Sequence, residues 1–405
     1  MTAKTNGSPG HGNWPAGTGM VYVAMAPWDG MWKNRHQLMS RFAKQMPVLY
    51  VEPWKTLRKT RRHGITHTIQ SFRQSRCSPV HHGDSLYVLP QSDGPPISGG
   101  RLVAGISRRL WLRYLREALA TVKITRPILW ISRPEQRFIV GHANEMLSIY
   151  HVVDEYSGYT DLSVDKQRRL QKEEARLLAA VDAVVVVSPE LQQSKTVSGR
   201  EPYVVENAVD FERFSEVADR PSDMAKLSGP IFGYSGLIGR RLNLSLILKL
   251  AKMEPGWAIV LLGKVDPRGC EREIELMRSQ ENIHMLGQKA VTEVANYVAN
   301  FDVGLLPYEL DLETENISPL KMYEYLAVGI PVISTPIPAA LRSADVVSIA
   351  GSDAEFASLC RAALQADDEY QRKTRIEFAR SNTWEKRVDQ LSEIIGSHLK
   401  ASNHV

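Results

Sequence analysis

The sequence predicts an α/β protein made of two doubly wound domains, each with a parallel sheet covered by helices. Three observations predict this class. Short apolar stretches alternate with helical ones, these stretches fall into two series, and a polar stretch punctuated by proline and glycine, residues 206–229, separates the two series. Continuous apolar strands with helices between them are typical of parallel sheets buried on both faces. A chain of 405 residues also suits two domains better than one.

The first series defines an N-terminal domain, which we place at residues 19–208. Residues 1–18 are rich in glycine and proline and lack an apolar core, so we interpret them as a flexible tail and not as a secretion signal. A helix is predicted near 34–46. The strands predicted in this domain are 20–26, 47–52, 127–132, 147–153 and 183–188.

The second series defines a C-terminal domain at residues 230–380. Residues 209–229 are predicted to be a linker between the two domains. Residues 381–405 contain one amphipathic helix, which we expect to pack back on the N-terminal domain. The strands predicted in the C-terminal domain are 230–236, 258–263, 282–286, 303–308, 331–335 and 346–350.

Bulk composition indicates an ordinary globular protein, with 43% hydrophobic and 23% charged residues. No run of about 18 apolar residues exists, so no transmembrane helix is expected. The cysteines Cys77, Cys270 and Cys360 are far apart and show neither a metal motif nor a disulfide framework. This cysteine usage fits a cytoplasmic protein.

The stretch "SPLKMYEYLAVGIPVIST", residues 318–335, predicts a short helix followed by a strand. Ser318 suits the N-cap, Pro319 the first helical position, and Gly329 a left-handed C-cap before Pro331. Lys321 then lies near the positive end of the helix dipole, where a cation is mildly unfavourable. A phosphate bound at this helix end would remove the conflict.

Glu324 follows Lys321 by three residues and is predicted to lie on the same helix face. Two interpretations are open. The carboxylate forms a surface ion pair with Lys321, worth less than about 1 kcal/mol. Alternatively, it accepts hydrogen bonds from sugar hydroxyls, such as the two of a ribose.

The stretch "GYSGLIGRRLNLSLILKLAK", residues 233–252, is a glycine-rich turn between a strand and a helix that Asn243 can cap. Small residues such as Gly236 allow a ligand to approach the backbone, and Arg240 and Arg241 suit phosphate. The spacing G-x-x-G-x-x-G is not the dinucleotide fingerprint. A tight turn with a solvated charge pair is therefore an open alternative.

Lys264 follows the strand 258–263 and is either a solvated lysine or a ligand-binding one. Ligands of open α/β sheets bind outside the carboxyl ends of the strands. If the second sheet is doubly wound, Lys264, Lys321, Arg240 and Arg241 converge on one crevice. Four converging cations at helix starts favour a diphosphate ligand.

Several stretches, in their order and spacing, carry a resemblance to a known family. They are "APWDGMWKNRHQLMSRFAKQMPVLYVEP", "EEARLLAAVDAVVVVSPEL", "VVENAVDFERF", "NIHMLGQKAVTEVANYVANFDVGLLPY" and "SPLKMYEYLAVGIPVIST". Together they resemble the retaining GT-B glycosyltransferases of the group 1 or family 4 type, in particular enzymes of polysaccharide and teichuronic-acid biosynthesis. The resemblance covers most of the chain. It implies two Rossmann-like domains that face each other across a cleft.

The resemblance also implies roles for residues of the donor site. Glu324 corresponds to the second glutamate of the family's E-x7-E motif, which binds the ribose, and Asn316 stands at the first. Arg240 or Arg241 stands where the family has a phosphate-binding arginine, with Lys264 or Lys321 in place of its usual lysine. Gly287 belongs to the stretch that holds the nucleobase. Ser318 and Pro319 replace the family's Phe-Gly.

Asp154, in "YHVVDEY", stands where the family often has a histidine or aspartate that faces the transferred sugar; the alternative is an ordinary turn residue at a strand end. Members of the fold generally use no metal, so none is expected here. The stretch "DLE", residues 311–313, is similar to a metal-binding D-x-D. We interpret it as a solvated loop.

A strongly basic region lies in the first domain. Between Pro53 and Arg126 there are fourteen lysines and arginines, including the cluster Arg58–Arg62, and only three acidic residues. The predicted helix 101–120 combines an apolar stripe with basic neighbours, namely Leu110, Trp111, Tyr114 and Leu115 with Arg108, Arg109, Arg113 and Arg116. It is either a core-facing helix with a basic outer face or a surface that binds anionic lipid, with Trp111 inserted. No motif supports nucleic-acid binding.

The resemblance implies a glycosyltransferase that moves a sugar from a nucleotide-sugar donor, with retention, to a glycan or lipid-linked acceptor in cell-surface polysaccharide biosynthesis. Such an enzyme would work in the cytoplasm or peripherally on the inner face of the membrane. Two alternatives stay open: a nucleotide-sugar epimerase of the same fold, and a non-catalytic subunit that binds nucleotide sugars, which the departure at Asn316 favours.

Overall fold

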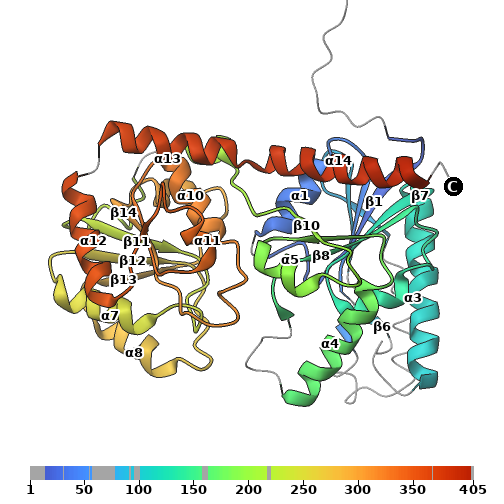
Figure 1. The fold of residues 1–405 in the computed structure, drawn as a ribbon, viewed down its shortest axis with the longest axis horizontal. Helices are drawn as coiled ribbons and strands as arrows, with labels where there is room; N and C mark the ends of the chain where they lie inside the picture. The colour runs from blue at the N-terminus through green and yellow to red at the C-terminus, as the bar shows by residue number, and fades with distance from the viewer. Residues whose placement is uncertain are drawn as a thin grey trace, which may run out of the picture. The chain divides into compact units, whose positions relative to one another are not determined.

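The computed structural model shows an α/β protein of two compact units, residues 1–205 with 388–405 and residues 206–387 (Figure 1). We call them unit 1 and unit 2. The structure describes residues 14–30, 32–53, 55–56, 78–90, 93–94, 101–156, 163–216, 220–366 and 368–402. Each unit has its own largely parallel sheet, which confirms the predicted fold class.

The sheet of unit 1 has eight strands in the order β10-β9-β8-β7-β1-β2-β5-β4, and every neighbouring pair is parallel except β4 with β5. Strand β2 pairs with one side of β1, and β7, which comes later in the chain, pairs with the opposite side of β1. The topological switch point therefore lies between β1 and β7. The strands are β1 Thr18–Val23, β2 Val48–Val51, β4 Val80–His81, β5 Leu86–Leu89, β7 Arg126–Ile131, β8 Leu147–Val152, β9 Ala183–Val186 and β10 Tyr203–Val204. A separate two-stranded sheet pairs β3 Lys55–Thr56 with β6 Asp93–Gly94.

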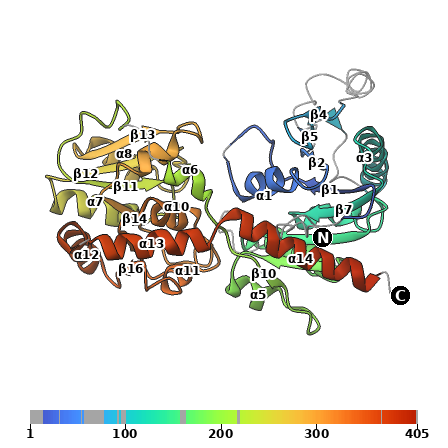
Figure 2. The same ribbon diagram turned by 90° about the horizontal axis from the view of Figure 1, so that it is seen from above.

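The helices of unit 1 are α1 Asn34–Phe42, α3 Arg101–Thr121, the 3-10 helix η2 Pro134–Ile139, α4 Val164–Leu178 and α5 Pro189–Lys195. Helix α14, Trp384–Ser402, begins in unit 2, and its residues from 388 onward belong to unit 1. There the Gln390 Nε2 donates to the Val204 carbonyl at 3.1 Å, which attaches α14 to the edge strand β10 (Figure 2).

The sheet of unit 2 has six strands, all parallel, in the order β13-β12-β11-β14-β15-β16. Its switch point lies between β11 and β14. The strands are β11 Ile231–Ser235, β12 Ala258–Leu262, β13 Ile283–Gly287, β14 Val303–Leu306, β15 Val332–Ser334 and β16 Ser348–Ile349. The helices wholly in unit 2 are α6 Phe211–Ser215, α7 Leu244–Met253, α8 Glu271–Ser279, α9 Val294–Val298, α10 Leu320–Val328, α11 Pro338–Leu341, α12 Asp353–Ala366 and α13 Glu369–Ser381.

All eleven strands predicted from the apolar stretches are present, whereas the short strands β3, β4, β5, β6 and β10 were not predicted. The predicted linker 209–229 differs from what the structure shows. Val209, Phe214 and Met224 of this segment are at most 5% exposed and join the core of unit 2. The burial of these three side chains was not predicted, because most residues around them in the sequence are polar.

Two of the cysteines, Cys270 and Cys360, are buried free thiols, and Cys77 lies outside the described residues. Among the helices that the structure describes, none has the length and apolar character needed to cross a membrane.

Candidate functional site

Three loops at the carboxyl edge of the unit 2 sheet run side by side as nearly bare backbone. Gly236 follows β11 and its amide donates to the Leu262 carbonyl at 2.8 Å, while the Gly263 amide donates to the Gly287 carbonyl at 2.8 Å. A Cβ on Gly263 would lie 1.8 Å from the Gly236 carbonyl oxygen, and both glycines have positive φ, 146° and 154°. Only glycine fits there. The edge next to the switch point therefore offers backbone that a ligand can approach closely.

Lys321 lies against this backbone. A Cβ on Gly236 would be 2.9 Å from the Lys321 Cε, so the lysine side chain passes directly over the glycine. Lys264 follows Gly263 and is exposed, and its carbonyl accepts a hydrogen bond from the Ile238 amide at 2.9 Å. Among the described residues neither lysine forms an ion pair. Both ammonium groups are therefore available to an anionic ligand at this edge.

The start of α10 differs from the prediction by one residue. The helix begins at Leu320 with Pro319 as N-cap, and no side chain caps it. The hydroxyl of Ser318 is occupied elsewhere, because it accepts from the Asn207 amide at 3.1 Å, and the Ser318 carbonyl accepts from the Asn207 side chain at 2.6 Å. Ser318 thus anchors a neighbouring segment and is 5% exposed. The left-handed C-cap at Gly329, with φ 83°, is confirmed.

Glu324 lies one turn after Lys321 on α10, and the two side chains form no ion pair among the described residues. Burial raises the pKa of Glu324, while Lys321 and Arg213 act against that rise. Burial also raises the pKa of Tyr308 to about 12, with Arg241 opposing and Glu324 reinforcing the change. Glu324 and Arg241 therefore both act on the Tyr308 hydroxyl, which places them in one electrostatic neighbourhood.

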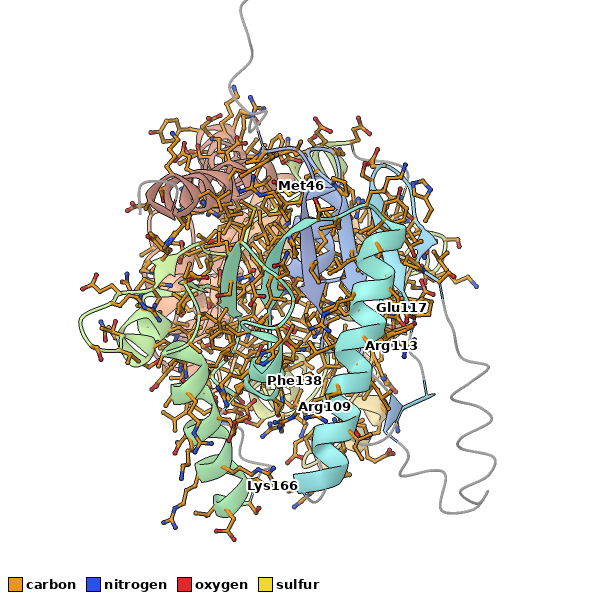
Figure 3. All side chains as sticks on the ribbon, turned by 90° about the vertical axis from the view of Figure 1, so that its right-hand side faces the viewer. Met46, Arg109, Arg113, Glu117, Phe138 and Lys166 are labelled. Carbon is orange, nitrogen blue, oxygen red and sulfur yellow. The ribbon has the colours of Figure 1, made fainter. Side chains whose placement is uncertain are left out.

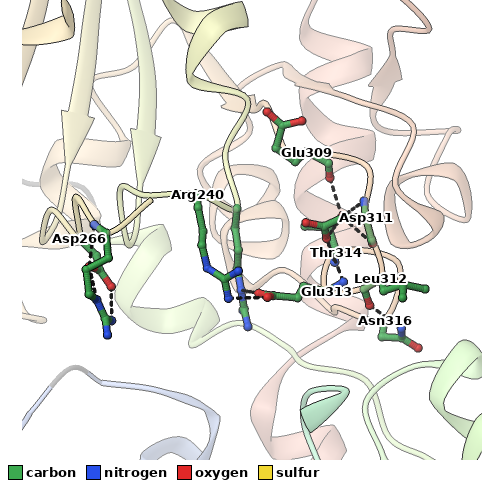
Figure 4. A network of polar contacts seen from close by, with 10 residues as sticks. Arg240, Asp266, Glu309, Asp311, Leu312, Glu313, Thr314 and Asn316 are labelled. Atoms are coloured by element: carbon green, nitrogen blue, oxygen red, sulfur yellow. Dashed lines mark hydrogen bonds and ion pairs between the residues drawn. The ribbon is translucent and has the colours of Figure 1, made fainter. Parts of the chain in front are cut away.

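Arg240 and Arg241 share one buried carboxylate, that of Glu313 (Figure 4). The Arg240 Nη2 donates to the Glu313 Oε1, and the Arg241 Nε donates to the Glu313 Oε2 at 3.0 Å. The Glu313 side chain is 2% exposed, whereas those of Arg240 and Arg241 are 37% and 34% exposed. The interpretation of residues 311–313 as a solvated loop was wrong for Glu313. The arginines are likewise not a purely solvated pair.

The loop 309–316 that carries Glu313 is held by its own polar groups (Figure 4). One oxygen of Asp311 accepts from the amides of Glu313 and Thr314, each at 2.9 Å, and the Asn316 side chain donates to the Leu312 carbonyl at 2.9 Å. Asp311 thus serves the turn. Across the described residues, no group of three or more histidine, cysteine, aspartate or glutamate side chains is arranged to hold a metal ion.

In unit 1, Asp154 follows β8 and is partly exposed at the carboxyl edge of that sheet. The next residue, Glu155, enters a buried ionic network: the Lys195 Nζ lies 2.6 Å from the Glu155 carboxylate and 2.8 Å from that of Glu174. The Tyr150 hydroxyl donates to Glu174 at 2.7 Å. This network fixes the turn that carries Asp154. This network was not predicted from the sequence.

A signal for this network was present in α4. Glu174 occupies the apolar stripe that Leu170, Leu177 and Leu178 otherwise form, and all four side chains are buried. A carboxylate on an apolar stripe predicts a buried partner, because an unpaired buried charge is costly. The partner, Lys195, lies 21 residues further along the chain, so its identity required the tertiary structure.

A second buried group holds the loop after β1. His36 is 0% exposed; its Nδ1 accepts from the Lys33 amide at 2.9 Å, and its Nε2 therefore donates to the Trp28 carbonyl at 3.0 Å. Burial and the neighbouring Arg35 lower the pKa of His36 to about 4. The Trp28 amide also donates to Glu52 at 2.7 Å. The neutral histidine and this carboxylate thus shape the loop from two sides.

The helix predicted at 101–120 corresponds to α3, and it is the core-facing helix of the first interpretation. Trp111 is 3% exposed and Leu115 0%, so the expectation that Trp111 inserts into a membrane was wrong. The helical period directs these side chains to the sheet and leaves the arginines on the outer face (Figure 3). Arg113 pairs there with Glu117 at 2.9 Å. The cluster Arg58–Arg62 lies outside the described residues.

Comparisons with known proteins agree with this architecture. Residues 241–366 match the family model described as "Glycosyl transferases group 1". The putative teichuronic acid biosynthesis glycosyltransferase TuaH of Bacillus subtilis (strain 168) is 28% identical over 252 residues, which cover 59% of this chain and 63% of the relative. The match therefore spans less than two thirds of the relative's length. The resemblance noted in the sequence is confirmed.

Solved structures share the fold over almost the whole chain. Sucrose-phosphate synthase from Thermosynechococcus elongatus superposes with a TM-score of 0.68 at 15% identity, covering 95% of this chain and 99% of that one. Anabaena Alr3699/HepE in complex with UDP and glucose superposes with a TM-score of 0.64 at 13% identity, covering 93% and 99%. At such identities the likeness establishes the fold alone, which is the GT-B fold.

Proposed function

We propose that this chain, which belongs to the group 1 glycosyltransferases, transfers a sugar from a nucleotide-sugar donor to a glycan or lipid-linked acceptor. One observation carries the proposal. At the switch point of the unit 2 sheet, the bare backbone at Gly236 and Gly263 lies beside Lys321, which has no ion-pair partner among the described residues. Lys321 falls within the segment 241–366 that matches the family. Such an edge suits the diphosphate of a nucleotide sugar.

The donor would be held by groups with distinct tasks. Lys264, Lys321 and the arginine pair Arg240–Arg241 would bind the diphosphate, and Glu324 would accept hydrogen bonds from the ribose. Gly287 would lie beside the nucleobase, because its loop adjoins Gly263. Asn316 and Asp154 would contact the transferred sugar. The structure of Alr3699/HepE with UDP and glucose supports a uridine-diphosphate sugar as one donor to test.

The chemistry requires stabilisation of a leaving diphosphate. Glycosyl transfer passes through an oxocarbenium-like state while negative charge grows on the leaving group. Lysine ammonium groups and the N-terminus of α10, which a ligand would meet already in position, stabilise that charge as it develops. We propose that this occurs with retention and without a metal. Asp311 is engaged in holding its own loop and is not offered as a metal ligand.

The outer face of α3 suits a negatively charged surface. Arg108, Arg109, Arg113 and the apolar Ile106 are all exposed, Ile106 at 58%. Each such arginine contributes about 1 kcal/mol near an anionic membrane. The description of the relative TuaH as a putative teichuronic acid biosynthesis glycosyltransferase supports a polysaccharide as product. A peripheral enzyme on the inner face of the membrane would meet a lipid-linked acceptor there.

Vesicle sedimentation tests this surface. The protein should bind vesicles that contain anionic lipid at low salt and be released near molar salt, where screening shortens to about 3 Å. Arg109→Gln should weaken binding by about 1 kcal/mol. Binding that ignores lipid charge, or no binding, would favour a soluble acceptor instead.

A thermal-shift panel of nucleoside diphosphates and nucleotide sugars tests the main proposal, since a ligand bound by the native state raises the melting temperature. The active ligands are then incubated with acceptor. If no nucleotide shifts the transition, the donor site is wrong. Binding without turnover would indicate the non-catalytic binding subunit, which the amide at Asn316 favours. Conversion of the donor without acceptor would indicate an epimerase.

A further inference from the structure

We infer that Glu313 is a positioning residue of the diphosphate site: it holds Arg240 and Arg241 in place and ties them to the loop that carries Asn316. The inference rests on the proposed function, because it assigns the arginines to the same diphosphate. From the sequence, Glu313 was interpreted only as part of the solvated loop 311–313. Its role follows from contacts between two segments that lie 72 residues apart in the chain.

The geometry is that of one anion shared between two cations (Figure 4). Each carboxylate oxygen of Glu313 accepts from a different guanidinium, Oε1 from Arg240 and Oε2 from Arg241. Guanidinium groups are planar and lose little further freedom once one edge is fixed. A ligand that meets arginines already oriented avoids the entropy cost of ordering them. Glu313 therefore prepares the pair before the ligand arrives.

Burial separates the two sides of this contact. Glu313 is 2% exposed, while about a third of each arginine side chain faces solvent. The carboxylate holds the arginines from the protein side, and the ligand would approach from the solvent side. The pair plus the carboxylate also leave one net positive charge at the site.

Glu313 itself has little freedom to move. Its amide donates to the Asp311 carboxylate at 2.9 Å, so the backbone at this residue is fixed by the turn. The Glu309 amide donates to the Arg241 carbonyl at 2.9 Å, and the Asn243 amide donates to the Pro307 carbonyl at 2.7 Å. With the backbone held, only a rotation of the buried side chain would withdraw the carboxylate from the arginines. It is therefore a fixed support and not a mobile competitor of the phosphate.

The same loop links the arginines to Asn316. The side chain of Asn316 donates to the Leu312 carbonyl at 2.9 Å, next to Glu313 in the chain. A displacement of the arginine pair would thus be transmitted through Glu313 to the residue proposed to contact the sugar. The loss of Glu313 should impair both diphosphate affinity and the transfer step.

Calorimetric titration of the full-length protein tests this inference, with UDP, GDP and ADP as probes and the tightest binder used for the variants. Glu313→Gln should weaken binding by about tenfold or more, the loss expected when a charged hydrogen bond is removed. Glu313→Asp keeps the negative charge, so its affinity for the nucleoside diphosphate should fall less than that of Glu313→Gln. Glu254→Gln is the matched control, because Glu254 pairs with Arg361 at the C-terminal end of α7; its affinity should equal that of the wild type.

The decisive measurement compares the double variant Arg240→Ala/Arg241→Ala with the triple variant that adds Glu313→Gln. If Glu313 acts through the arginines, both should bind the probe equally, although Glu313→Gln alone is costly. The triple variant leaves no buried unpaired carboxylate. If Glu313→Gln alone fails to fold, the triple variant therefore still shows whether Glu313 affects binding without the arginines. A purely structural loop residue would instead lower the affinity of both backgrounds by the same factor.

Tighter binding in Glu313→Gln would overturn the inference, because it would make Glu313 a competitor of the phosphate. The inference would also be overturned if the triple variant bound the probe more weakly than the double variant by the factor that Glu313→Gln costs alone. Wild-type protein that binds none of the three probes would contradict the proposed function itself. Wild-type binding that Glu313→Gln leaves unchanged would contradict only the role of Glu313.

Discussion

At the carboxyl edge of the unit 2 sheet, Gly236 and Gly263 leave bare backbone beside Lys321, whereas at the same edge of the unit 1 sheet large rings and paired charges fill the space. In unit 1, His36 and Trp28 pack at 4.8 Å between ring centroids behind the loop after β1, and Lys195 joins two carboxylates behind the turn after β8. One edge is open to anions and the other is filled to fix its turns.

Under the proposed function, the difference would allow one architecture to serve two kinds of ligand. A diphosphate needs close access to amides and cations, so large side chains are excluded from the loops that would receive it. A turn that would present a single carboxylate, as proposed for Asp154, needs rigid support from the residues packed behind it.

The largest effect of a single substitution is expected in the buried network of unit 1. Lys195→Met should lower the free energy of unfolding by about 3–5 kcal/mol, because it leaves the carboxylates of Glu155 and Glu174 buried without their cation. Denaturant unfolding followed by hydrogen exchange of unit 1 peptides measures the change. The control is Lys249→Met, whose exposed pair with Asp353 should contribute less than about 1 kcal/mol. If both variants lost the same free energy of unfolding, the buried network would contribute no more to stability than an exposed ion pair.

The next effect is acid sensitivity of unit 1. Burial lowers the pKa of His36 and of His151 to about 4, so between pH 6.5 and 4 the unfolded chain binds more protons than the folded one. The stability these groups contribute is complete above pH 6.5 and is lost as the pH falls, by about 3 kcal/mol per histidine at pH 4. Hydrogen exchange at pH 7 and 4.5 compares the two units. His151→Phe should remove part of the pH dependence, and an unchanged profile would contradict the assignment.

In unit 2, Lys321→Ala should weaken binding of a nucleoside diphosphate by about 1.5–3 kcal/mol, the contribution of a charged hydrogen bond. Calorimetric titration measures the loss. Lys252→Ala changes an exposed lysine in the last turn of α7 and should have no effect. If both variants bind as the wild type does, the open edge of unit 2 is not the diphosphate site.

The smallest effect concerns the ribose. Glu324→Gln keeps the shape but loses the charge, and should weaken binding of a ribonucleotide by about 1 kcal/mol. A 2′,3′-dideoxy analogue lacks the hydroxyls and should be affected much less. Equal losses for the two nucleotides would show that the carboxylate acts in another way, for example through its effect on Tyr308.

Much of the fold was predictable because it depends on local patterns. The apolar strands of both sheets, the cap at Asn243 and the left-handed glycine at Gly329 each depend on neighbouring residues, and the structure contains all of them. The start of α10 was misplaced because the Ser318 hydroxyl bonds to Asn207, 111 residues away, instead of capping the helix. The hydrogen bond with the distant Asn207 thus replaced the capping bond that serine prefers at a helix start.

Local patterns in the sequence suffice to predict two parallel α/β units, and they show that glycines and cations follow the strands of the second unit. Which polar groups pair with one another depends instead on how the chain folds in three dimensions. The apolar stripe of α3 was visible in the sequence, but its burial against the sheet is a property of the assembled unit, because a membrane would accept the same stripe. The pairing of Glu313 with Arg240 and Arg241 likewise depends on β11 and β14 lying side by side, a long-range contact that no local pattern encodes.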